Sequence, residues 1–491
     1  METSTTRRGF LGAAGAIAAG AFASRASAAP FARAVGPGAN AFVSRPDLNP
    51  PPVTISTPAS GTSAGFLFLA PYDISASAAV PGKYGPMILD ENGQLVWYLP
   101  TRALTAMDFK VQKYRGQPVL TWYEGDVLSG YGGRYHIYDN TYHEVAKVSA
   151  GNGFSGDLHE FVITSRGTAL IAIYGQVTAN LSSVGGSAAG QLVIGIVQEI
   201  DIPTGKVLFQ WSSYDHVPVT ESNMTQVTSF GNVDYFHLNA IAVDLDGDLL
   251  ISSRHTSCVY KVDRKTGAIK WRLGGNRSDF QFMPGAAFNY QHDVRRHADG
   301  TLTIFDNGAS APGQTVEPFT RPIRLSLDMN AMTATLVKEY LPAAPRVSWA
   351  MGNVQLLPDG GVCVGWGTDG AFTEFDSTGG VRFDASLTDG SISYRTFRSP
   401  WKAKPTGHPA VAITPNPNGT QTVYASWNGA TEVDAWQVRG GAHPAALKTL
   451  RTVPRTGFET AIVIPRTSGH VVAAALGVSG KQLGVSAPVP V

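Results

Sequence analysis

Three histidines and an asparagine stand at related places in short repeated blocks of this chain. His159, Asn239 and His292 each begin a block that ends in a turn glycine eight positions later, as in NAIAVDLDG. His237 lies two residues before Asn239 and so shares its face on an extended strand. Imidazoles can act as nucleophile, acid or base near neutral pH. With a nearby arginine, such a donor-rich set suits a tetrahedral anion, for example a sulfuryl group carried between aromatic alcohols.

The turn in each block predicts which residue faces the first one, because residues equidistant from a hairpin turn lie opposite each other. The expected facing pairs are Asn239–Arg254, His292–Asn307, His159–Tyr174, Asp108–Tyr123 and Gly352–Gly367. The predicted catalytic residues are His159, His237, Asn239, Arg254 and His292. The predicted substrate-binding residues are Tyr123, Tyr174, Asn307, Trp349 and Trp366, with the glycine pair leaving an open side.

The repeated blocks contain few residues that could bind a metal or a phosphate. Asp108 is the one carboxylate at a matching position, and there is no serine-nucleophile motif, glycine-rich phosphate loop or carboxylate pair. We therefore predict neither a metal nor a diffusible cofactor. The remaining histidines, His255 among them, fall outside the pattern and are expected to be structural or exposed.

The elements that must position these residues are short strands in a repeat. Blocks with the same spacing begin at Asp108, His159, Asn239, His292 and Gly352, and each turn is followed by another apolar strand. A repeat of about 40 to 60 residues with several strands per unit is typical of a β-propeller. A first unit that starts with VTIST completes six predicted blades over residues 53–404, with the polar first residues converging on the channel.

The spacing is lost in residues 405–491. Trp427 and Trp436 on early strands and a late VVAAALGVSGKQLG pair favour a small β-sandwich of the fibronectin or immunoglobulin type. The alternative is that this stretch supplies a seventh blade. The predicted fold is therefore all-β, a six-bladed β-propeller followed by a small C-terminal β-sandwich.

The N-terminus has the features of a targeting segment. Arg7 and Arg8 precede a weakly apolar Ala/Gly stretch that ends in a small-residue cleavage site at 26–28. Residues 1–29 are thus expected to be a twin-arginine signal peptide, and residues 30–52 a linker or an arm. The mature protein would be extracellular, on the cell surface or periplasmic. No later run is apolar enough to span a bilayer.

Composition excludes some partners. Charged residues are 15% of the chain and the formal net charge is +1, so nothing favours nucleic acid as a partner. Cys258 and Cys363 lie in or beside apolar strands and are interpreted as buried free thiols, although a disulfide stays open.

Several longer motifs resemble the bacterial arylsulfate sulfotransferase family, in its actinobacterial and fungal-like branch. They are GPMILDENGQLVWY, DLHEF, YFHLNAIAVDLDGDLLISSRHTS, IKWRLGG, YQHD and VYASWNGATEV. The resemblance implies a six-bladed propeller that moves a sulfuryl group from a phenolic sulfate ester to another phenol, without a nucleotide donor. Enterobacterial members carry their sandwich at the N-terminus, so dimer contacts do not transfer to this chain, and an oligomer stays possible.

The resemblance also implies roles for single residues. The family's sulfated histidine falls on His292 of YQHD, and its HxN pair falls on His237 and Asn239. In the expected ping-pong mechanism, neutral His292 attacks an aryl sulfate while Arg254, Asn239 and His237 hold the sulfuryl oxygens. His159 transfers the proton, alone or shared with His237. The partners would be a small-molecule aryl sulfate donor and a phenolic acceptor.

The sequence alone leaves three other functions open. The segment DRKTGAIKW at 263–271 resembles a repeat of quinoprotein dehydrogenases, although it does not recur in each block. The three histidines could instead hold a metal in a hydrolase or lyase. The chain could also be a binding propeller without catalysis.

Overall fold

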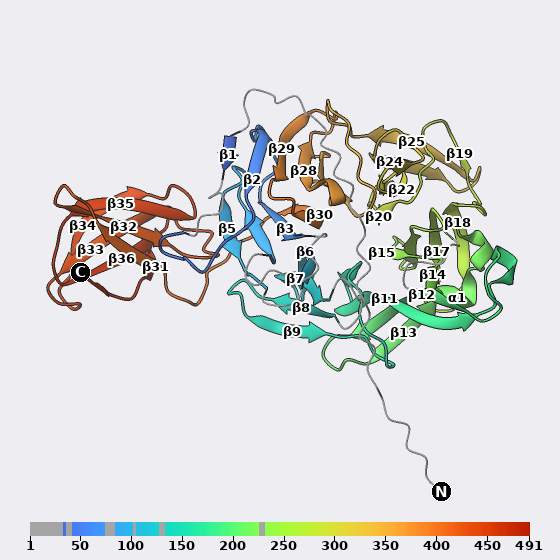
Figure 1. Cartoon of the computed structure of the whole chain (residues 1–491), viewed down its shortest axis with the longest axis horizontal. Helices are drawn as coiled ribbons and strands as arrows, with labels where there is room; N and C mark the ends of the chain where they lie inside the picture. Colours follow the sequence, from blue (N-terminus) through green and yellow to red (C-terminus); the bar gives the residue numbers. More distant parts are fainter. Residues whose placement is uncertain (1–32, 36–41, 74–83, 102–104, 127–132, 225–230) are drawn as a thin grey trace, which may run out of the picture.

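The computed structural model describes residues 33–35, 42–73, 84–101, 105–126, 133–224 and 231–491 (Figure 1). These residues form 38 β-strands, the α-helix α1 (Ser213–His216) and the 3-10 helices Ser182–Val184, Val219–Glu221 and Gly367–Asp369. The prediction of an all-β fold is therefore confirmed. The predicted signal peptide at 1–29 lies outside the described residues. Within the described parts of the chain, no helix has the length and apolar character needed to cross a membrane.

Six sheets of four or more strands surround a common centre (Figure 1). The first consists of β30 (Ile392–Ser399), β3 (Phe66–Tyr72), β4 (Met87–Leu89) and β5 (Leu95–Tyr98). The second consists of β6 (Thr105–Tyr114), β7 (Gln117–Gly125), β8 (Arg134–Tyr138) and β9 (Glu144–Val148). The third consists of β10 (Phe161–Ile163), β11 (Thr168–Ala179), β12 (Gly190–Asp201) and β13 (Val207–Ser212), with β14 (Asn232–Asp234) parallel to β12.

The other three sheets of this ring follow in chain order. The fourth consists of β15 (Leu238–Val243), β16 (Leu249–Ser253), β17 (Cys258–Val262) and β18 (Ile269–Gly274). The fifth consists of β20 (His292–Arg296), β21 (Leu302–Asp306), β24 (Arg321–Asp328), β25 (Thr333–Glu339) and β19 (Gln281–Phe282). The sixth consists of β26 (Asn353–Leu356), β27 (Val362–Gly365), β28 (Ala371–Phe375), β29 (Val381–Leu387), β2 (Val53–Thr57) and β1 (Arg33–Val35). A separate hairpin joins β22 (Ala309–Ala311) and β23 (Gln314–Thr315).

The first strands of these six sheets meet at the centre. Strand β6 contacts β30 and β10, β15 contacts β10 and β20, and β26 contacts β20 and β30, so the contacts form a closed cycle. Strands such as β16 (LLISS) are buried along their whole length, as expected for a sheet covered on both faces. The beginnings of the inner strands therefore meet, and this is where the predicted catalytic residues lie.

The ring is closed by strands from both ends of its sequence. Strand β2, which contains VTIST, pairs with β29 of the sixth sheet, so its predicted place in the first sheet is wrong. Strand β30, near residue 400, instead pairs with β3 as the inner strand of the first sheet. Val53 and Ile55 of β2 are buried against Phe383 and Leu387 of the sixth sheet, and this apolar contact explains the exchange.

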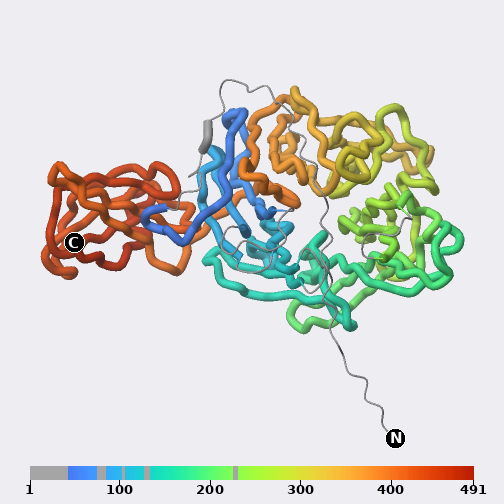
Figure 2. The backbone as a smooth tube through the Cα atoms, in the orientation of Figure 1, coloured from blue at the N-terminus to red at the C-terminus, as the bar shows by residue number. Residues whose placement is uncertain are grey.

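The last eighty residues form two sheets of their own, which we call the C-terminal module (Figure 2). One consists of β31 (Ala410–Pro415), β32 (Thr420–Ser426) and β35 (Glu459–Pro465). The other consists of β34 (Lys448–Pro454), β33 (Ala435–Gly441), β36 (His470–Leu476), β37 (Gln482–Val485) and β38 (Val489–Pro490). An apolar cluster that includes Trp427, Trp436 and Ile462 lies between them. Among the described strands, none of the C-terminal module pairs with a strand of the ring.

Several contacts fix the C-terminal module to the rest of the chain. The Asn428 side chain accepts from the Tyr98 amide and donates to the Tyr98 carbonyl, both at 2.9 Å, and so occupies the free edge of β5. The predicted arm adds a second contact, because Phe42 packs on Phe458 with ring centroids 4.4 Å apart. Cys258 and Cys363 are both buried and free, which confirms the interpretation as free thiols.

Three inner strands carry a bulge where the repeat begins. The register shifts between Met107 and Lys110, between Leu238 and Ala240, and between His292 and Arg295. Asp108, His237 and Asp293 lie at or next to these shifts, and their φ angles are 55°, 52° and 54°, respectively. Positive φ is strained for residues other than glycine, and bulges of this kind re-aim side chains beside functional sites.

An ion cluster without excess charge crosses the centre of the ring below the histidines. Its members, which we call the axial ion cluster, are Asp108, Glu160, Asp293, Lys110, Arg295 and Arg395. Arg395 has a fully buried side chain and lies 2.9 Å from Asp108 and 3.2 Å from Glu160. Charges buried so deeply persist because each has an opposite partner. The cluster joins β6, β20 and β30 to the residue before β10, and it thereby holds in place the strands that carry the site.

Candidate active site

The structure brings the three predicted histidines together. The rings of His159 and His237 meet edge to face with centroids 5.1 Å apart. His292 and Arg254 contact the same segment, because the Met351 amide donates to His292 Nε2 and Arg254 donates to the Trp349 carbonyl. Tyr174 stacks on His159 at 5.1 Å and its hydroxyl donates to the Leu238 carbonyl. Residues from the third, fourth and fifth sheets thus form one site.

His292 is held as a neutral imidazole. Burial, and next the charge of Arg254, lower the pKa of His292 well below its usual range. Its Nδ1 lies 2.7 Å from Asn307 Oδ1, and its Nε2 lies 3.2 Å from the Met351 amide nitrogen. Since the amide can only donate, Nε2 carries the lone pair and Nδ1 carries the proton. This is the tautomer that a nucleophilic Nε2 requires.

The other two histidines are paired with carboxylates. Asp157 Oδ1 lies 2.5 Å from His159 Nδ1, and Asp234 Oδ2 lies 2.6 Å from His237 Nδ1. The carboxylates accept from Nδ1–H, so each Nε2 is left to accept or take up a proton. Burial, followed by the charges of His159 and Arg254, lowers the pKa of His237 well below its usual range. His237 is therefore a proton acceptor at rest and cannot donate to a sulfuryl oxygen.

Arg254 is the cation of the site, and most of its donors are already used. Its Nη2 donates to the carbonyls of Trp349 at 2.9 Å, Ser310 at 2.8 Å and Ala309 at 3.3 Å. Its Nη1 donates to His255 Nε2 at 2.9 Å. Burial lowers the pKa of Arg254 to about 10, which leaves the guanidinium charged at neutral pH. Its Nε–H is buried and has no hydrogen-bond partner among the described residues.

Asn239 does not face Arg254 as expected. Ser253 pairs with Leu238 across the bulge, and the Arg254 amide donates to the His237 carbonyl at 3.0 Å. The Asn239 side chain instead donates to the Gln291 carbonyl at 2.6 Å, directly before His292. Asn239 is therefore placed to fix the strand that carries His292, and its predicted role as a sulfuryl ligand is not supported by this contact.

Two other facing pairs also differ from the prediction. Tyr123 pairs with Met107 rather than Asp108, and His292 pairs with Phe305 rather than Asn307. The His292–Asn307 contact is nevertheless made by the side chains. The prediction from hairpin symmetry therefore identified residues that lie close together, but not the residue directly opposite on the partner strand.

The predicted substrate-binding aromatics are mostly structural. Tyr123 is fully buried, and Trp366 is fully buried with its indole N–H donating to Thr373 Oγ1 at 2.8 Å. Trp349 is half-buried and contributes its carbonyl to Arg254. Tyr174 is the predicted aromatic that contacts the histidines.

The predicted open side at the glycine pair is wrong. A Cβ on Gly352 would lie 2.3 Å from the Phe305 ring, and one on Gly367 would lie 2.6 Å from the Ala350 carbonyl oxygen. Glycine is needed at both places because the chain packs closely there.

Three residues of the site escaped the sequence analysis. His255, expected to be structural or exposed, is buried with its ring centroid 4.5 Å from that of His237. Asp157 and Asp234 orient the other two rings. The available signal was the spacing, because an aspartate stands two residues before His159 and three before His237.

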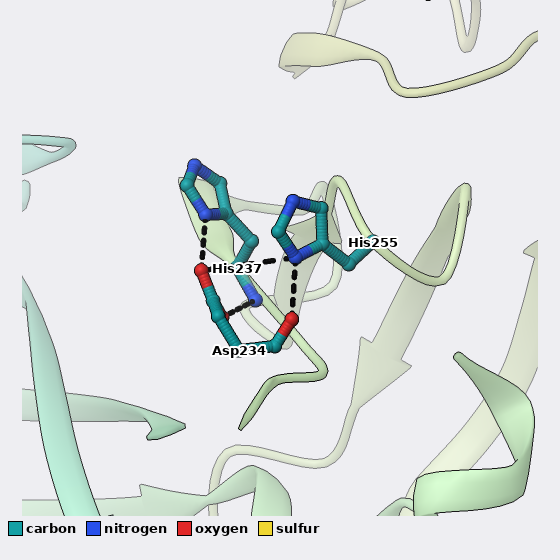
Figure 3. A group of neighbouring side chains, drawn as sticks. All are labelled: Asp234, His237 and His255. Atoms are coloured by element: carbon teal, nitrogen blue, oxygen red, sulfur yellow. Dashed lines mark hydrogen bonds and ion pairs between the residues drawn. The ribbon is translucent and has the colours of Figure 1, made fainter. Parts of the chain in front are cut away.

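Asp234, His237 and His255 offer donor atoms within 4.8 Å of one another, as a metal site would (Figure 3). The protons argue against this use. Arg254 donates to His255 Nε2, so the ring proton is on His255 Nδ1, which lies 2.6 Å from the Asp234 carbonyl oxygen. The Nδ1 atoms that would bind a metal therefore carry hydrogens, and a guanidinium lies beside them.

We expect turnover to survive EDTA and to need no added quinone or nucleotide, because hydrogen bonds within the site occupy the candidate metal donors. The measurement is transfer from nitrophenyl sulfate to phenol before and after dialysis against EDTA. Loss of transfer that Zn²⁺ or Mn²⁺ restores would favour a metal-dependent hydrolase or lyase instead.

Comparison with known proteins gives a family. A family model described as arylsulfotransferase (ASST) matches residues 110–388. A search of the curated proteins gives no match.

Solved structures with some similarity include three bacterial proteins. A Bacteroides caccae protein of unknown function is 12% identical, with a TM-score of 0.41 over 68% of this chain and 98% of that chain. The periplasmic gluconolactonase PpgL of Pseudomonas aeruginosa is 13% identical, with a TM-score of 0.36 over 82% and 99%. A catalytically inactive virginiamycin B lyase of Staphylococcus aureus with quinupristin is 8% identical, with a TM-score of 0.34 over 77% and 97%.

The family match covers more than half of the 491 residues and contains His159, His237, Arg254 and His292. This chain therefore belongs to the arylsulfotransferase family.

Proposed function

We propose that this sulfotransferase moves a sulfuryl group from an aryl sulfate ester to a phenolic acceptor in two steps, through a sulfohistidine at His292 and without a nucleotide donor. We further propose that the six sheets are the blades of a propeller over residues 53–404 and that residues 405–491 are a β-sandwich. The closed cycle of inner strands and the separate sheets of the C-terminal module support this division. Export by the twin-arginine route to the cell surface, periplasm or medium completes the proposal.

The chemical nature of the Nδ1 partners is the observation that carries the proposal. His159 and His237 each face a carboxylate, whereas His292 faces the amide oxygen of Asn307. A carboxylate stabilises an imidazolium and so suits a proton carrier. The neutral amide of Asn307 stabilises an imidazolium less than a carboxylate would, and it cannot remove the Nδ1 proton. His292 is thereby the nucleophile, and the other two are proton carriers.

In the first step, His292 Nε2 attacks sulfur and its lone pair forms the N–S bond. The bond between sulfur and the aryl oxygen breaks, and its electron pair leaves with the phenolate. His159 enters this step as an imidazolium paired through Nδ1 with Asp157, and it donates its Nε2 proton to that oxygen. The product is a phenol and an N-sulfoimidazolium that keeps its Nδ1 proton against Asn307.

In the second step, an acceptor phenol gives its proton to His159, with His237 as a second proton acceptor, and its oxygen attacks the same sulfur. The N–S bond breaks and its electrons return to His292 Nε2. The retained Nδ1 proton helps here, because a neutral imidazole is a better leaving group than an imidazolate. Arg254 stabilises the sulfuryl oxygens in both steps, with its unpartnered Nε–H as the free donor.

One contact must open before the first step. The Met351 amide occupies the His292 lone pair at 3.2 Å, where sulfur has to arrive. The same segment is held by Arg254 at the Trp349 carbonyl and by Asn307 at the Ser348 carbonyl, 2.8 Å away. A sulfuryl group that draws Arg254 toward itself would weaken the hold on Trp349 and let Met351 withdraw.

The direct test is intact-mass measurement after incubation with nitrophenyl sulfate and no acceptor. A gain of one sulfuryl group that disappears when phenol is added supports the two-step transfer. An unchanged mass during active turnover would contradict it and leave direct transfer between the two substrates.

His159→Ala should slow transfer from phenyl sulfate much more than transfer from nitrophenyl sulfate. A nitrophenolate departs with little protonation, whereas a phenolate of pKa near 10 needs an acid. The measurement is the rate of enzyme sulfation by each donor in the same variant. If both donors slow equally, His159 is not the acid, and His237 becomes the better candidate.

A further inference from the structure

We propose that Asp234 and His255 are positioning residues that aim the proton acceptor His237 and the cation Arg254 together. The inference rests on the proposed function, and it assigns a task to two buried residues that the two-step transfer does not use directly. It starts from one aspartate between two imidazole rings, which bonds His237 through its carboxylate and His255 through its backbone carbonyl (Figure 3).

Asp234 ends strand β14 and lies between the two rings. Its Oδ2 accepts from His237 Nδ1 at 2.6 Å, and its Oδ1 accepts from the His237 amide at 3.1 Å. Its backbone carbonyl accepts from His255 Nδ1 at 2.6 Å, and its Oδ2 lies 3.7 Å from the same nitrogen. Figure 3 shows both Nε2 atoms on the sides of the rings away from Asp234. One residue thus sets the orientation of both imidazoles.

His255 carries that orientation to Arg254. Burial lowers the pKa of His255 to about 3, so its ring has a single proton at neutral pH. The Nδ1–H group of His255 donates a hydrogen bond to the Asp234 backbone carbonyl. Its Nε2 accepts a hydrogen bond from Arg254 Nη1 at 2.9 Å. The guanidinium is fixed on its other side by the Trp349, Ser310 and Ala309 carbonyls. His255 is therefore the contact that fixes Nη1 and, with it, the direction of the free Nε–H.

Two further observations favour this arrangement over a solvated cluster. The side chains of His255 and Asp234 are 10% and 16% exposed, so water competes little for these bonds. Asp234 also lies at a chain position set by β14, which pairs in parallel with β12 and therefore belongs to the third sheet. His237 and His255 belong to the fourth. Asp234 consequently joins the two sheets at the site, through its carboxylate to His237 and its backbone carbonyl to His255.

Inorganic sulfate tests the Arg254 branch without requiring turnover. In His255→Leu the guanidinium loses its acceptor, and we expect sulfate affinity to fall about tenfold or more, the effect of one charge-assisted hydrogen bond. His255→Gln keeps an amide oxygen near the Nε2 position and should restore most of the affinity. Isothermal titration calorimetry measures all three proteins, and thermal unfolding confirms that each is folded.

Asp234→Asn tests the His237 branch. An amide cannot stabilise the imidazolium form of its partner, so the group that accepts the phenol proton should acquire a lower pKa. In the His159→Ala background, where His237 is the remaining proton acceptor, the acid limb of the pH profile for the acceptor step should therefore move to lower pH by about one unit, while the maximal rate falls. A purely structural role would change the unfolding temperature without moving this limb.

The outcomes separate the inference from the function on which it rests. Sulfated wild-type enzyme together with equal sulfate affinity in wild type, His255→Leu and His255→Gln would overturn the positioning role alone. Absence of the sulfoenzyme with the expected affinity changes would overturn the two-step transfer alone. Wild-type protein that binds no sulfate also overturns the Arg254 branch. Stoichiometric Zn²⁺ binding that is lost in both Asp234→Asn and His255→Leu would identify a metal centre instead.

Discussion

Replacing His292 with alanine should abolish both turnover and covalent sulfation. A two-step transfer cannot bypass its nucleophile, and His159 and His237 differ from His292 because a carboxylate rather than an amide oxygen faces their Nδ1. The loss should therefore exceed that of any other single substitution in the site. The measurement combines steady-state transfer from nitrophenyl sulfate to phenol with the intact mass after exposure to the donor.

His143→Ala is the matched control, because His143 is exposed and its side chain bonds only to Thr141 among the described contacts. It should label and turn over like the wild type. Uptake of a sulfuryl group by His292→Ala would place the nucleophile elsewhere and contradict the central mechanistic claim.

Arg254→Ala should slow both half-reactions by about 100-fold or more, as for removal of one donor to a transition-state oxyanion. The free Nε–H and the positive charge disappear together, and the Trp349 carbonyl loses its clamp. Some sulfation of His292 should remain, because the nucleophile is intact. The two rates are the release of nitrophenolate in a single turnover and the transfer of the sulfuryl group from isolated sulfoenzyme to phenol.

Arg382→Ala removes a guanidinium of the outer strand β29 that pairs with Asp359, and it should leave both rates unchanged. Arg254→Lys keeps the charge without the planar set of donors and should recover part of the loss. A normal sulfation rate in Arg254→Ala would show that the sulfuryl charge is stabilised elsewhere.

The repeat in the sequence predicted the architecture because apolar alternation and turn glycines are local signals. It located the inner strands β6, β10, β15, β20 and β26 and brought His159, His237 and His292 to one place. It missed β30 as the sixth inner strand, since that strand has no partner nearby in the sequence and pairs instead with β3.

The side-chain pairs were harder to predict for a different reason. Hairpin symmetry assumes a regular ladder, but His237 and Asp293 have positive φ and the ladder slips there. A bulge of this kind cannot be predicted from the residue type when the residue with positive φ is not glycine. His255 was missed because Arg254 and His255 lie in the turn after β16, where strand alternation no longer decides which way a side chain points.

Because β2 and β30 close the ring, its last pairings can form only late in the synthesis of the chain. The sixth sheet lacks its outer strand until β29 meets β2, and the first sheet lacks its inner strand until β30 meets β3. Both pairings join residues more than 300 positions apart, so a nascent chain cannot complete the ring before residue 399 has left the ribosome. Contacts of such long range also make folding slow. A chain of this kind spends a long interval open and prone to aggregation, and a pathway that exports it only after folding would keep that interval inside the cell, within reach of chaperones.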